Sequence, residues 1–162
     1  MIRKVKQEDC KAIAAIYNGY IANSTITFET EPVSEEEMGR RISTIASQYP
    51  YLVCEVDNVV VGYCYAHAWK ERAAYSKTFE ISVYLSPECK GQGIGKQLML
   101  RLIDECKKKG CHALIACITE ENEGSKVFHL KLGFKQVSLF KEVGIKFGRR
   151  LDVSDYELLL ES

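Results

Sequence analysis

Three glycines within five residues, Gly91, Gly93 and Gly95, constrain this chain more than any other feature. They follow an apolar, strand-like run, Phe79–Leu85, and precede an amphipathic run, Lys96–Lys109. Glycine lets the main chain approach an anion closely, and the first amides of a helix have no partner within the helix. The helix dipole adds positive potential at the same point. This turn is therefore predicted to bind a phosphate.

Two familiar phosphate loops fit the turn poorly. A Walker A loop has four residues between its glycines and then Lys followed by Ser or Thr. Here three residues separate Gly91 from Gly95, and Gln97 follows Lys96. A dinucleotide fingerprint, G-x-G-x-x-G, would need its third glycine one residue later. The spacing therefore disfavours both a Walker A nucleotide and a nicotinamide cofactor.

Length and composition limit the class of protein. A chain of 162 residues, 46% of them hydrophobic, is long enough for one domain with a core, so we expect a single domain over 1–162. Its zero formal charge lacks the basic footprint of a nucleic-acid-binding protein. No apolar run approaches the roughly 20 residues that cross a bilayer, and no signal segment is visible. We therefore expect a cytoplasmic protein that binds neither nucleic acid nor membrane.

Cysteine usage agrees with that compartment. The seven cysteines are an odd number and include no C-x-x-C pair, which favours free thiols in a reducing environment. The alternative is a zinc site at the one cluster, Cys106, Cys111 and His112, but its spacing matches no common ligand pattern. We therefore expect no metal.

Hydrophobic periodicity and capping signals predict the order of elements. Asp9 is expected to cap a first helix, and Ser34–Glu37 is a capping box that opens a second helix ending near Gln48. Asp57-Asn58 is a hairpin signal between two strands. The expected strands are Ile2–Val5, Tyr51–Val56, Val59–Trp69, Thr78–Leu85, Cys111–Ile118, Phe134–Phe140 and Leu151–Leu160, with later helices at Lys96–Lys109 and Ser125–Leu132. The order βααβββαβαββ predicts an α+β (mixed α/β) fold, in which helices flank a largely antiparallel sheet.

The glycine turn resembles the acetyl-CoA pyrophosphate loop of the GNAT N-acetyltransferase superfamily, [Arg/Gln]-x-x-G-x-[Gly/Ala], with Lys90 in the first place. The order of elements matches that superfamily. Three further stretches, Asn23–Thr30, Trp69–Tyr75 and Val83–Pro87, resemble its phosphinothricin N-acetyltransferase branch, and the resemblance extends from Ile2 to about Val153. It implies acetyl-CoA as acetyl donor, a small amino acid or analogue as acceptor amine, and a homodimer.

The resemblance also implies which residues hold the cofactor. The backbone of Val83, Tyr84 and Leu85 would hold the pantetheine arm, and Asn122 the cofactor's far side. The pyrophosphate would lie on the glycine turn, made of Lys90, Gly91, Gln92, Gly93, Ile94, Gly95 and Lys96.

Glu80 is the candidate general base. Strand alternation places it on one face of its strand with Ser82 and Tyr84, the one carboxylate in an otherwise apolar strand. Partial burial would raise its pKa and suit it to accept a proton from an ammonium group. The resemblance gives this position the same role. The alternative is an acid on a solvated face, or one paired with Arg72 or Lys70.

The role of His129 stays open at this point. It occupies the place where many relatives carry a tyrosine that protonates the leaving thiolate. A histidine can do that, contact the substrate, or be a satisfied core residue. His67 and His112 have no such placement and are interpreted as structural.

The acceptor pocket is predicted from a loop and one aromatic residue. Lys70, Arg72 and Tyr75 could grip a carboxylate or phosphinate, a role that the resemblance supports; the alternative is a solvated loop. Phe28 would wall the pocket unless it belongs to the core.

Three functions are thus in competition. The leading one is direct transfer of acetyl from acetyl-CoA to the α-amino group of a small amino acid or analogue of the phosphinothricin or methionine sulfoximine type. No cysteine is placed as an acyl carrier. The second is acetylation of a protein N-terminus or another small amine, and the third is a non-catalytic acyl-CoA-binding module.

Overall fold

The computed structural model describes residues 1–161, which form eight strands and four α-helices. The strands are β1 (Ile2–Lys4), β2 (Tyr51–Val56), β3 (Val59–Ala68), β4 (Thr78–Leu85), β5 (Ala113–Thr119), β6 (Lys135–Gln136), β7 (Phe140–Lys146) and β8 (Arg149–Leu159). The helices are α1 (Cys10–Asn23), α2 (Glu35–Ala46), α3 (Ile94–Lys108) and α4 (Glu123–Lys131). Short 3-10 turns lie at Gln7–Asp9, Ala73–Tyr75 and Pro87–Cys89.

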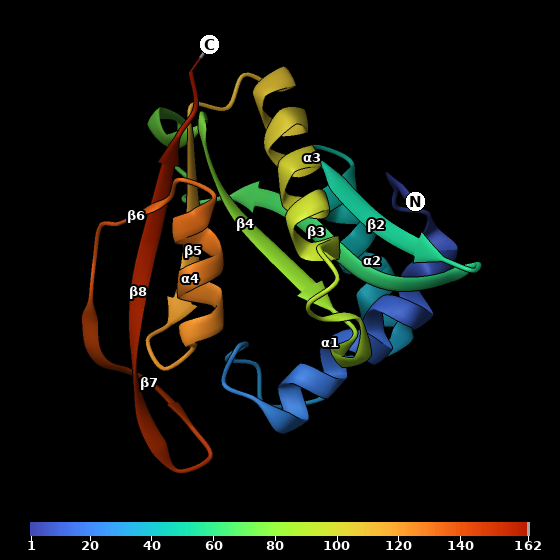
Figure 1. Cartoon of the computed structure of the whole chain (residues 1–162), viewed down its shortest axis with the longest axis horizontal. Coiled ribbons are helices and arrows are strands. Elements are labelled where there is room, and N and C mark those ends of the chain that lie inside the picture. Colours follow the sequence, from blue (N-terminus) through green and yellow to red (C-terminus); the bar gives the residue numbers. More distant parts are fainter. Residues whose placement is uncertain (162) are drawn as a thin grey trace.

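All strands belong to one sheet. Its order is β1-β2-β3-β4-β5-β8-β6, and β7 also pairs with β8. Every neighbouring pair is antiparallel except β4 and β5, which run parallel and are joined by the crossover helix α3 (Figure 1). The predicted mixed α/β fold with a largely antiparallel sheet is therefore confirmed.

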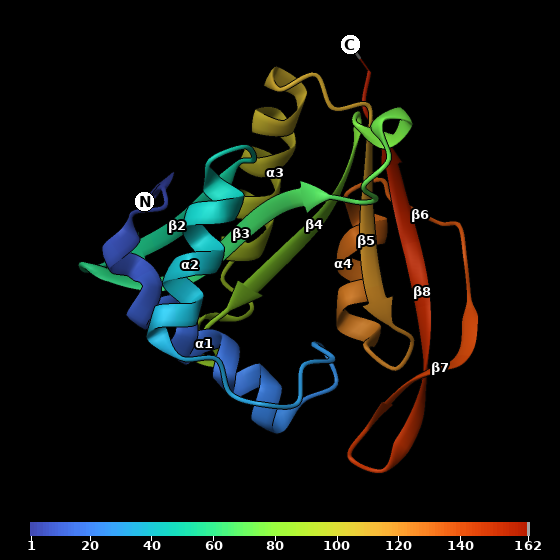
Figure 2. The same ribbon diagram turned by 180° about the vertical axis from the view of Figure 1, so that it is seen from behind.

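Helices cover the two faces of the sheet unequally (Figures 1 and 2). One face carries α3 and α4 over a core that includes Leu98, Leu102 and Leu114. The other face carries α1 and α2, which pack on β2 and β3 through Ile13 and Ile42. In Figure 2 no helix of the described residues lies over β5 and β8 on this second face. The sheet is therefore open to solvent beside β4.

The alternation predicted for β4 is confirmed. Phe79 and Ile81 are buried in the core under α3, whereas Tyr84 packs with the cluster under α1. The Asp57-Asn58 hairpin is also confirmed, because both residues have positive φ, 51° and 65°, as a type I′ turn requires. Glu80 therefore projects on the partly open face of the sheet.

The two predicted helix starts have different outcomes. The Ser34 side chain accepts a hydrogen bond from the Glu37 amide, so this cap is confirmed. Asp9 stands at the N-cap of α1 but makes no side-chain cap, which corrects the prediction. Its carboxylate accepts hydrogen bonds from the Arg3 guanidinium and the Lys6 amide instead. Burial opposes ionisation of Asp9, but these donors outweigh it and lower its pKa.

The predicted strand Phe134–Phe140 is wrong. Only Lys135 and Gln136 pair there, and a separate strand, β7, begins at Phe140 and forms a hairpin with β8. The chain leaves the sheet after Gln136, whose side chain bonds the Ser138 carbonyl. The apolar residues between β6 and β7, Val137 and Leu139, face solvent rather than the core. Hydrophobicity alone therefore gave a wrong prediction for this stretch.

Among residues 1–161, no helix combines the length and the apolar composition that crossing a membrane requires.

Candidate active site

The site lies where β4 and β5 separate. Their pairing joins Thr78, Phe79 and Glu80 to Ala113, Leu114 and Ile115, and no pair is formed beyond. Figure 2 shows the two strands diverging from this point. Backbone groups along the second half of β4 that face β5 therefore lack a strand partner, and a ligand with amide groups can use them.

A groove of about 410 Å³ follows this gap, large enough for part of a cofactor. The predicted cofactor residues that line it are Val83, Tyr84, Leu85, Lys90, Gly91, Gly95 and Asn122. Tyr20 and Phe128 contribute to the lining, although the sequence had not singled them out. The Tyr20 hydroxyl also donates a hydrogen bond to the Leu85 carbonyl. Seven of the eleven predicted cofactor residues are thus brought together.

The glycine turn is shaped as predicted. Gly91 and Gly93 both have φ of 81°, and a Cβ at either position would meet no atom of the described residues within 4 Å. Gly93 is the N-cap of α3, and the Gln97 amide makes the first bond of that helix, to the Gly93 carbonyl. The amides of Ile94, Gly95 and Lys96 therefore precede the helical bonding pattern and suit an anion.

The other predicted members of the turn do not line the groove with their side chains. Ile94 is buried in the core, Lys96 is exposed, and the Gln92 amide lies 3.4 Å from the Glu88 carbonyl. Their contribution to anion binding would come from the main chain.

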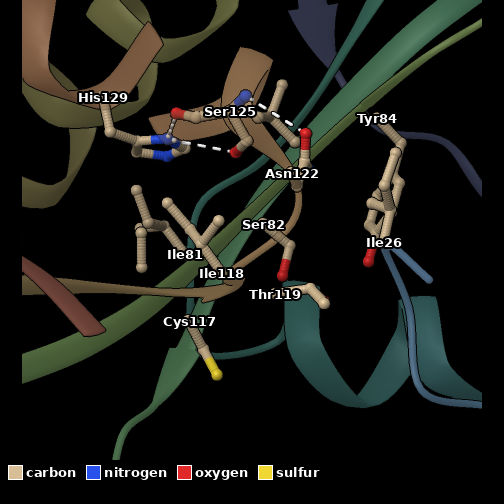
Figure 3. A pocket seen from close by; sticks show the side chains of 12 residues that line it. Ile26, Ile81, Ser82, Tyr84, Cys117, Ile118, Thr119, Asn122, Ser125 and His129 are labelled. Carbon is tan, nitrogen blue, oxygen red and sulfur yellow. Dashed lines mark hydrogen bonds between the residues drawn. The ribbon is translucent and has the colours of Figure 1, made fainter. Parts of the chain in front are cut away.

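The innermost part of the gap is narrow, about 60 Å³ (Figure 3). Asn122, Ser125 and His129 of α4 and the loop before it face Ile81 and Ser82 of β4 across it. The Asn122 side chain caps α4 by accepting from the Ser125 amide. A space of this size can hold an acetyl group.

His129 is buried and neutral. Its Nδ1 lies 2.8 Å from the Ser125 carbonyl, which can only accept, so Nδ1 carries the hydrogen. Burial lowers the pKa of His129. The Nε2 atom is then a hydrogen-bond acceptor at neutral pH, a poor arrangement for giving a proton to a thiolate.

Glu80 lies one residue from the narrow part of the gap and is half-buried, with 30% of its side chain exposed. Burial raises the pKa of Glu80, while the neighbouring His67 opposes this effect and Asp155 adds to it. No ion pair with Arg72 or Lys70 forms. A carboxylate in this environment binds a proton more readily than an exposed one.

His67 was interpreted as structural and instead lies beside Glu80. The two are directly opposite in the β3–β4 pair, with Nε2 and Oε2 3.6 Å apart. This contact could not be recognised from the sequence alone, because the alignment of the two antiparallel strands decides which residues meet. The nine residues between the strands hid the register.

Cys117 is exposed at the edge of the gap and points away from His129 (Figure 3). Partial burial of its sulfur and the Asp155 carboxylate opposite raise the pKa of Cys117 to about 12. It therefore stays a protonated, weakly nucleophilic thiol.

The predicted anion clamp lies on the loop before β4. Lys70 Nζ is 4.5 Å from the centre of the Trp69 ring and 5.6 Å from that of Tyr75, and the two rings meet edge to face. Arg72 is exposed. This group lies at the end of β4 remote from the glycine turn, and none of its members lines the gap between β4 and β5.

Phe28 lies on the connection between α1 and α2 and is 39% exposed. It packs on Gly144 of β7, where a Cβ would be only 2.2 Å from the ring. Buried Lys146 holds the same connection by donating to the Thr27 carbonyl over 2.8 Å. Phe28 is thus fixed between the helical layer and the last hairpin, and it does not line the gap.

Residues 1–161 contain no cluster of three or more His, Cys, Asp or Glu side chains arranged to hold a metal ion. All seven cysteines are free.

Known proteins share both the sequence and the fold. Residues 2–154 match the Acetyltransferase (GNAT) domain family. A phosphinothricin N-acetyltransferase from Alcaligenes faecalis is 39% identical over 93% of this chain and 78% of its own length. The L-amino acid N-acyltransferase MnaT from Escherichia coli (strain K12) is 35% identical over 99% of this chain and 94% of its own.

Solved structures agree. A GNAT superfamily phosphinothricin acetyltransferase from Sinorhizobium meliloti, in complex with AcCoA, superposes with a TM-score of 0.95. It is 39% identical to this chain, and the match covers 99% of this chain and 88% of that one. The chain therefore belongs to the GNAT acetyltransferase family, a class of acyltransferases. Its relatives include phosphinothricin N-acetyltransferases, as the sequence resemblance implied, and an L-amino acid N-acyltransferase.

Proposed function

We propose that this protein transfers the acetyl group of acetyl-CoA directly to the α-amino group of a small amino acid or analogue. One observation carries the proposal: a half-buried carboxylate, Glu80, stands immediately beside the gap that leads to the glycine turn. An amine acceptor needs a base, and the diphosphate of a CoA thioester needs an anion-binding site. These two features lie at opposite ends of one gap. The relatives named for amino acids and phosphinothricin support the acceptor class.

The residues present fit the cofactor. The amides at the start of α3 and the open space above Gly91 and Gly93 suit a pyrophosphate. The unpaired edge of β4 suits the amide groups of a pantetheine arm, and the narrow end of the gap suits an acetyl group. When bound there, acetyl-CoA supplies an activated thioester carbonyl.

The chain's own groups then have separate tasks. Glu80 takes a proton from the acceptor ammonium, directly or through one water, so that the amine becomes a nucleophile. An unpaired N–H on the edge of β4 stabilises the negative charge on the carbonyl oxygen. His129, held neutral, can accept a hydrogen bond at Nε2 from the S–H of the thiol product. The acceptor enters from the face of the sheet that no helix covers beside β4.

Lys70 and Arg72 lie outside the gap, and from there they favour an anionic acceptor over a polyamine through long-range charge alone. Two cations on the loop before β4 would attract a carboxylate or phosphinate and repel a polycation. Selectivity among amino-acid side chains amounts to about 1–3 kcal/mol per methylene in an apolar pocket, so only a substrate screen can name the natural acceptor.

We also infer a homodimer. Six large apolar side chains in one stretch of β7 and its approach are 44–64% exposed: Val137, Leu139, Phe140, Val143, Ile145 and Phe147. This concentration exceeds the single exposed apolar residues that are normal on a monomer. We infer that a second copy of the chain covers this apolar surface, as in the expected homodimer.

We infer a reducing compartment such as the cytoplasm, because all seven cysteines are free. We also infer one domain over 1–162, since a single sheet includes strands from Ile2 to Leu159.

The proposal is tested by thiol release from acetyl-CoA with phosphinothricin, methionine sulfoximine, ordinary amino acids, a polyamine and a short peptide. We expect turnover with one or more amino acids or analogues. In Glu80→Gln it should fall by about 10²–10⁴-fold, with the Kd for acetyl-CoA nearly unchanged. The control, Glu36→Gln, changes an exposed acid of α2 and should retain full activity.

Other outcomes separate the alternatives. Turnover with the polyamine or peptide alone would favour the second function. Binding of acetyl-CoA with no turnover on any amine would favour the non-catalytic module.

A further inference from the structure

His67 and Glu80 form a pair whose geometry goes beyond a simple surface contact. They are directly opposite on neighbouring strands, with His67 Nε2 3.6 Å from Glu80 Oε2. That distance is an ion-pair contact rather than a hydrogen bond. The two side chains are 34% and 30% exposed, so the pair connects the interior of the site with solvent.

The other ring nitrogen decides which protons the pair holds. His67 Nδ1 lies 3.0 Å from the Ala68 carbonyl oxygen, which can only accept a hydrogen bond. Nδ1 therefore carries a hydrogen in both the neutral and the charged ring. In the neutral ring, Nε2 carries a lone pair that faces a carboxylate oxygen. The contact then joins two hydrogen-bond acceptors, which repel each other. One proton placed on either atom turns this contact into attraction.

The remaining groups near Glu80 cannot take this role. Asp155 of β8 is an acid, and its charge makes ionisation of Glu80 harder. Tyr65 of β3 and Cys117 of β5 both have raised pKa values and stay protonated at neutral pH. Arg41 of α2 is paired with the carboxylates of Glu29 and Glu37. His67 is thus the one base among these neighbours that can exchange a proton with Glu80.

We propose that His67 receives the proton that Glu80 removes from the acceptor ammonium and passes it to solvent. The carboxyl O–H bond breaks as the Nε2–H bond forms, and the imidazolium then gives its proton to water. Glu80 returns to the carboxylate that the next turnover needs. His67 touches neither substrate nor cofactor in this scheme, so it is a positioning and relay residue that acts through Glu80. The inference rests on the proposed function.

A relay answers a difficulty in the site itself. A half-buried carboxyl group, with Asp155 nearby, holds a proton firmly once it has taken one. A neighbouring base gives that proton a second route to solvent. A partly exposed imidazole can pass a proton to solvent, because water reaches its ring.

The first test reads the pair without any reaction. ¹⁵N NMR of the imidazole rings, recorded against pH on the full chain without ligand, follows protonation of His67 Nε2. We expect the midpoint to move to lower pH in Glu80→Gln, because the ring loses its anionic partner. His112, on the loop before β5, is the internal reference and should not move. Identical titration of His67 in both proteins would overturn the pair.

The second test is kinetic. We expect His67→Gln to reduce kcat at pH 7 by about tenfold or more, with little change in the Kd for acetyl-CoA. The acid limb of kcat/KM should move to higher pH, because Glu80 loses the cation that favours its ionised form. His67→Ala should regain activity as free imidazole is added. A merely structural role would change thermal stability but give neither the shifted profile nor the rescue.

The control is His112→Gln, a histidine outside the site. An unshifted pH profile in His67→Gln, or a failure of imidazole to restore His67→Ala, would contradict the relay. If the wild-type protein acetylates no amine at all, the proposed function fails instead. The NMR titration still decides whether the two side chains share a proton.

Discussion

At the scale of single residues, the site depends on a conflict between burial and charge. Glu80 must be ionised to act, yet its half-buried position raises its pKa and makes ionisation costly. The same position keeps the carboxylate basic enough to take a proton from an ammonium group. Its environment therefore favours reactivity at the expense of stability.

This conflict makes a prediction about stability. The raised pKa means that folded Glu80 binds a proton more tightly than the unfolded chain does, so its contribution to stability is lost as pH rises through the folded value. Glu80→Gln removes that loss. We expect its Tm to exceed the wild-type Tm by about 2–4 °C at pH 7.5 and by almost nothing at pH 4.

Differential scanning calorimetry at several pH values measures the effect, with Glu36→Gln as the exposed control. A stability gain that is equal at both pH values, or present in the control, would show that ionisation of Glu80 is not its cause.

Some roles of single residues could be predicted from the sequence and others could not. Glu80 was recognisable because it is one carboxylate in an apolar strand of period two. The contact between Glu80 and His67 was not recognisable, since it depends on strand register across a long loop. Asp9 lies at the predicted helix start, but its carboxylate accepts hydrogen bonds from Arg3 instead of capping the helix.

At the scale of elements, the glycine turn and α3 act as one anion-binding unit. The turn was predictable because glycine adopts the positive φ found at Gly91 and Gly93 far more readily than residues with a Cβ. The boundaries of α3 differed by two residues or fewer from expectation. The turn therefore gives the sharpest test of cofactor binding.

Gly93→Val should abolish measurable acetyl-CoA binding, or raise its Kd by at least about tenfold, because a branched side chain is strained at this φ and blocks the amides. Isothermal titration calorimetry measures it. The matched control is Gly110→Val at the other end of α3, where φ is also 81°. Both variants should lose about 1–3 kcal/mol of stability from strain. Equal loss of binding in both would mean that strain alone is responsible.

The last strands were the least predictable elements. The stretch Phe134–Phe140 has the composition of a strand, but tertiary context divides it between the two-residue strand β6 and the start of β7. Burial of Phe134 and exposure of Phe140 separate the two parts. Hydrophobicity could not distinguish a side chain meant for the core from one on an external surface.

At the scale of the whole molecule, that external surface gives a prediction about assembly. Ile145→Glu places a charge in the apolar stretch of β7, and burying it unpaired between two copies would cost several kcal/mol. We expect wild-type protein to sediment as a dimer and this variant as a monomer. Val59→Glu, at a residue of similar exposure on the distant β2–β3 hairpin, should remain dimeric. A wild-type monomer at high concentration would refute the homodimer.

The order of elements, the class of sheet and the family were predictable because they depend on patterns that run through the whole chain. The separation of β4 from β5 was not, since it reflects how two parallel strands twist apart after three residue pairs. Placement of Lys70 and Arg72 away from the gap likewise depended on where the chain turns, not on composition.

The separation of β4 from β5 divides the sheet into two halves, β1 to β4 and β5 to β8. Three residue pairs join β4 to β5, and beyond these pairs the two halves share no backbone hydrogen bonds between strands. A bound molecule with amide groups would act as a temporary ninth strand and connect the two halves by hydrogen bonds. After its departure, the two halves of the sheet are joined by the three residue pairs and by the core under α3.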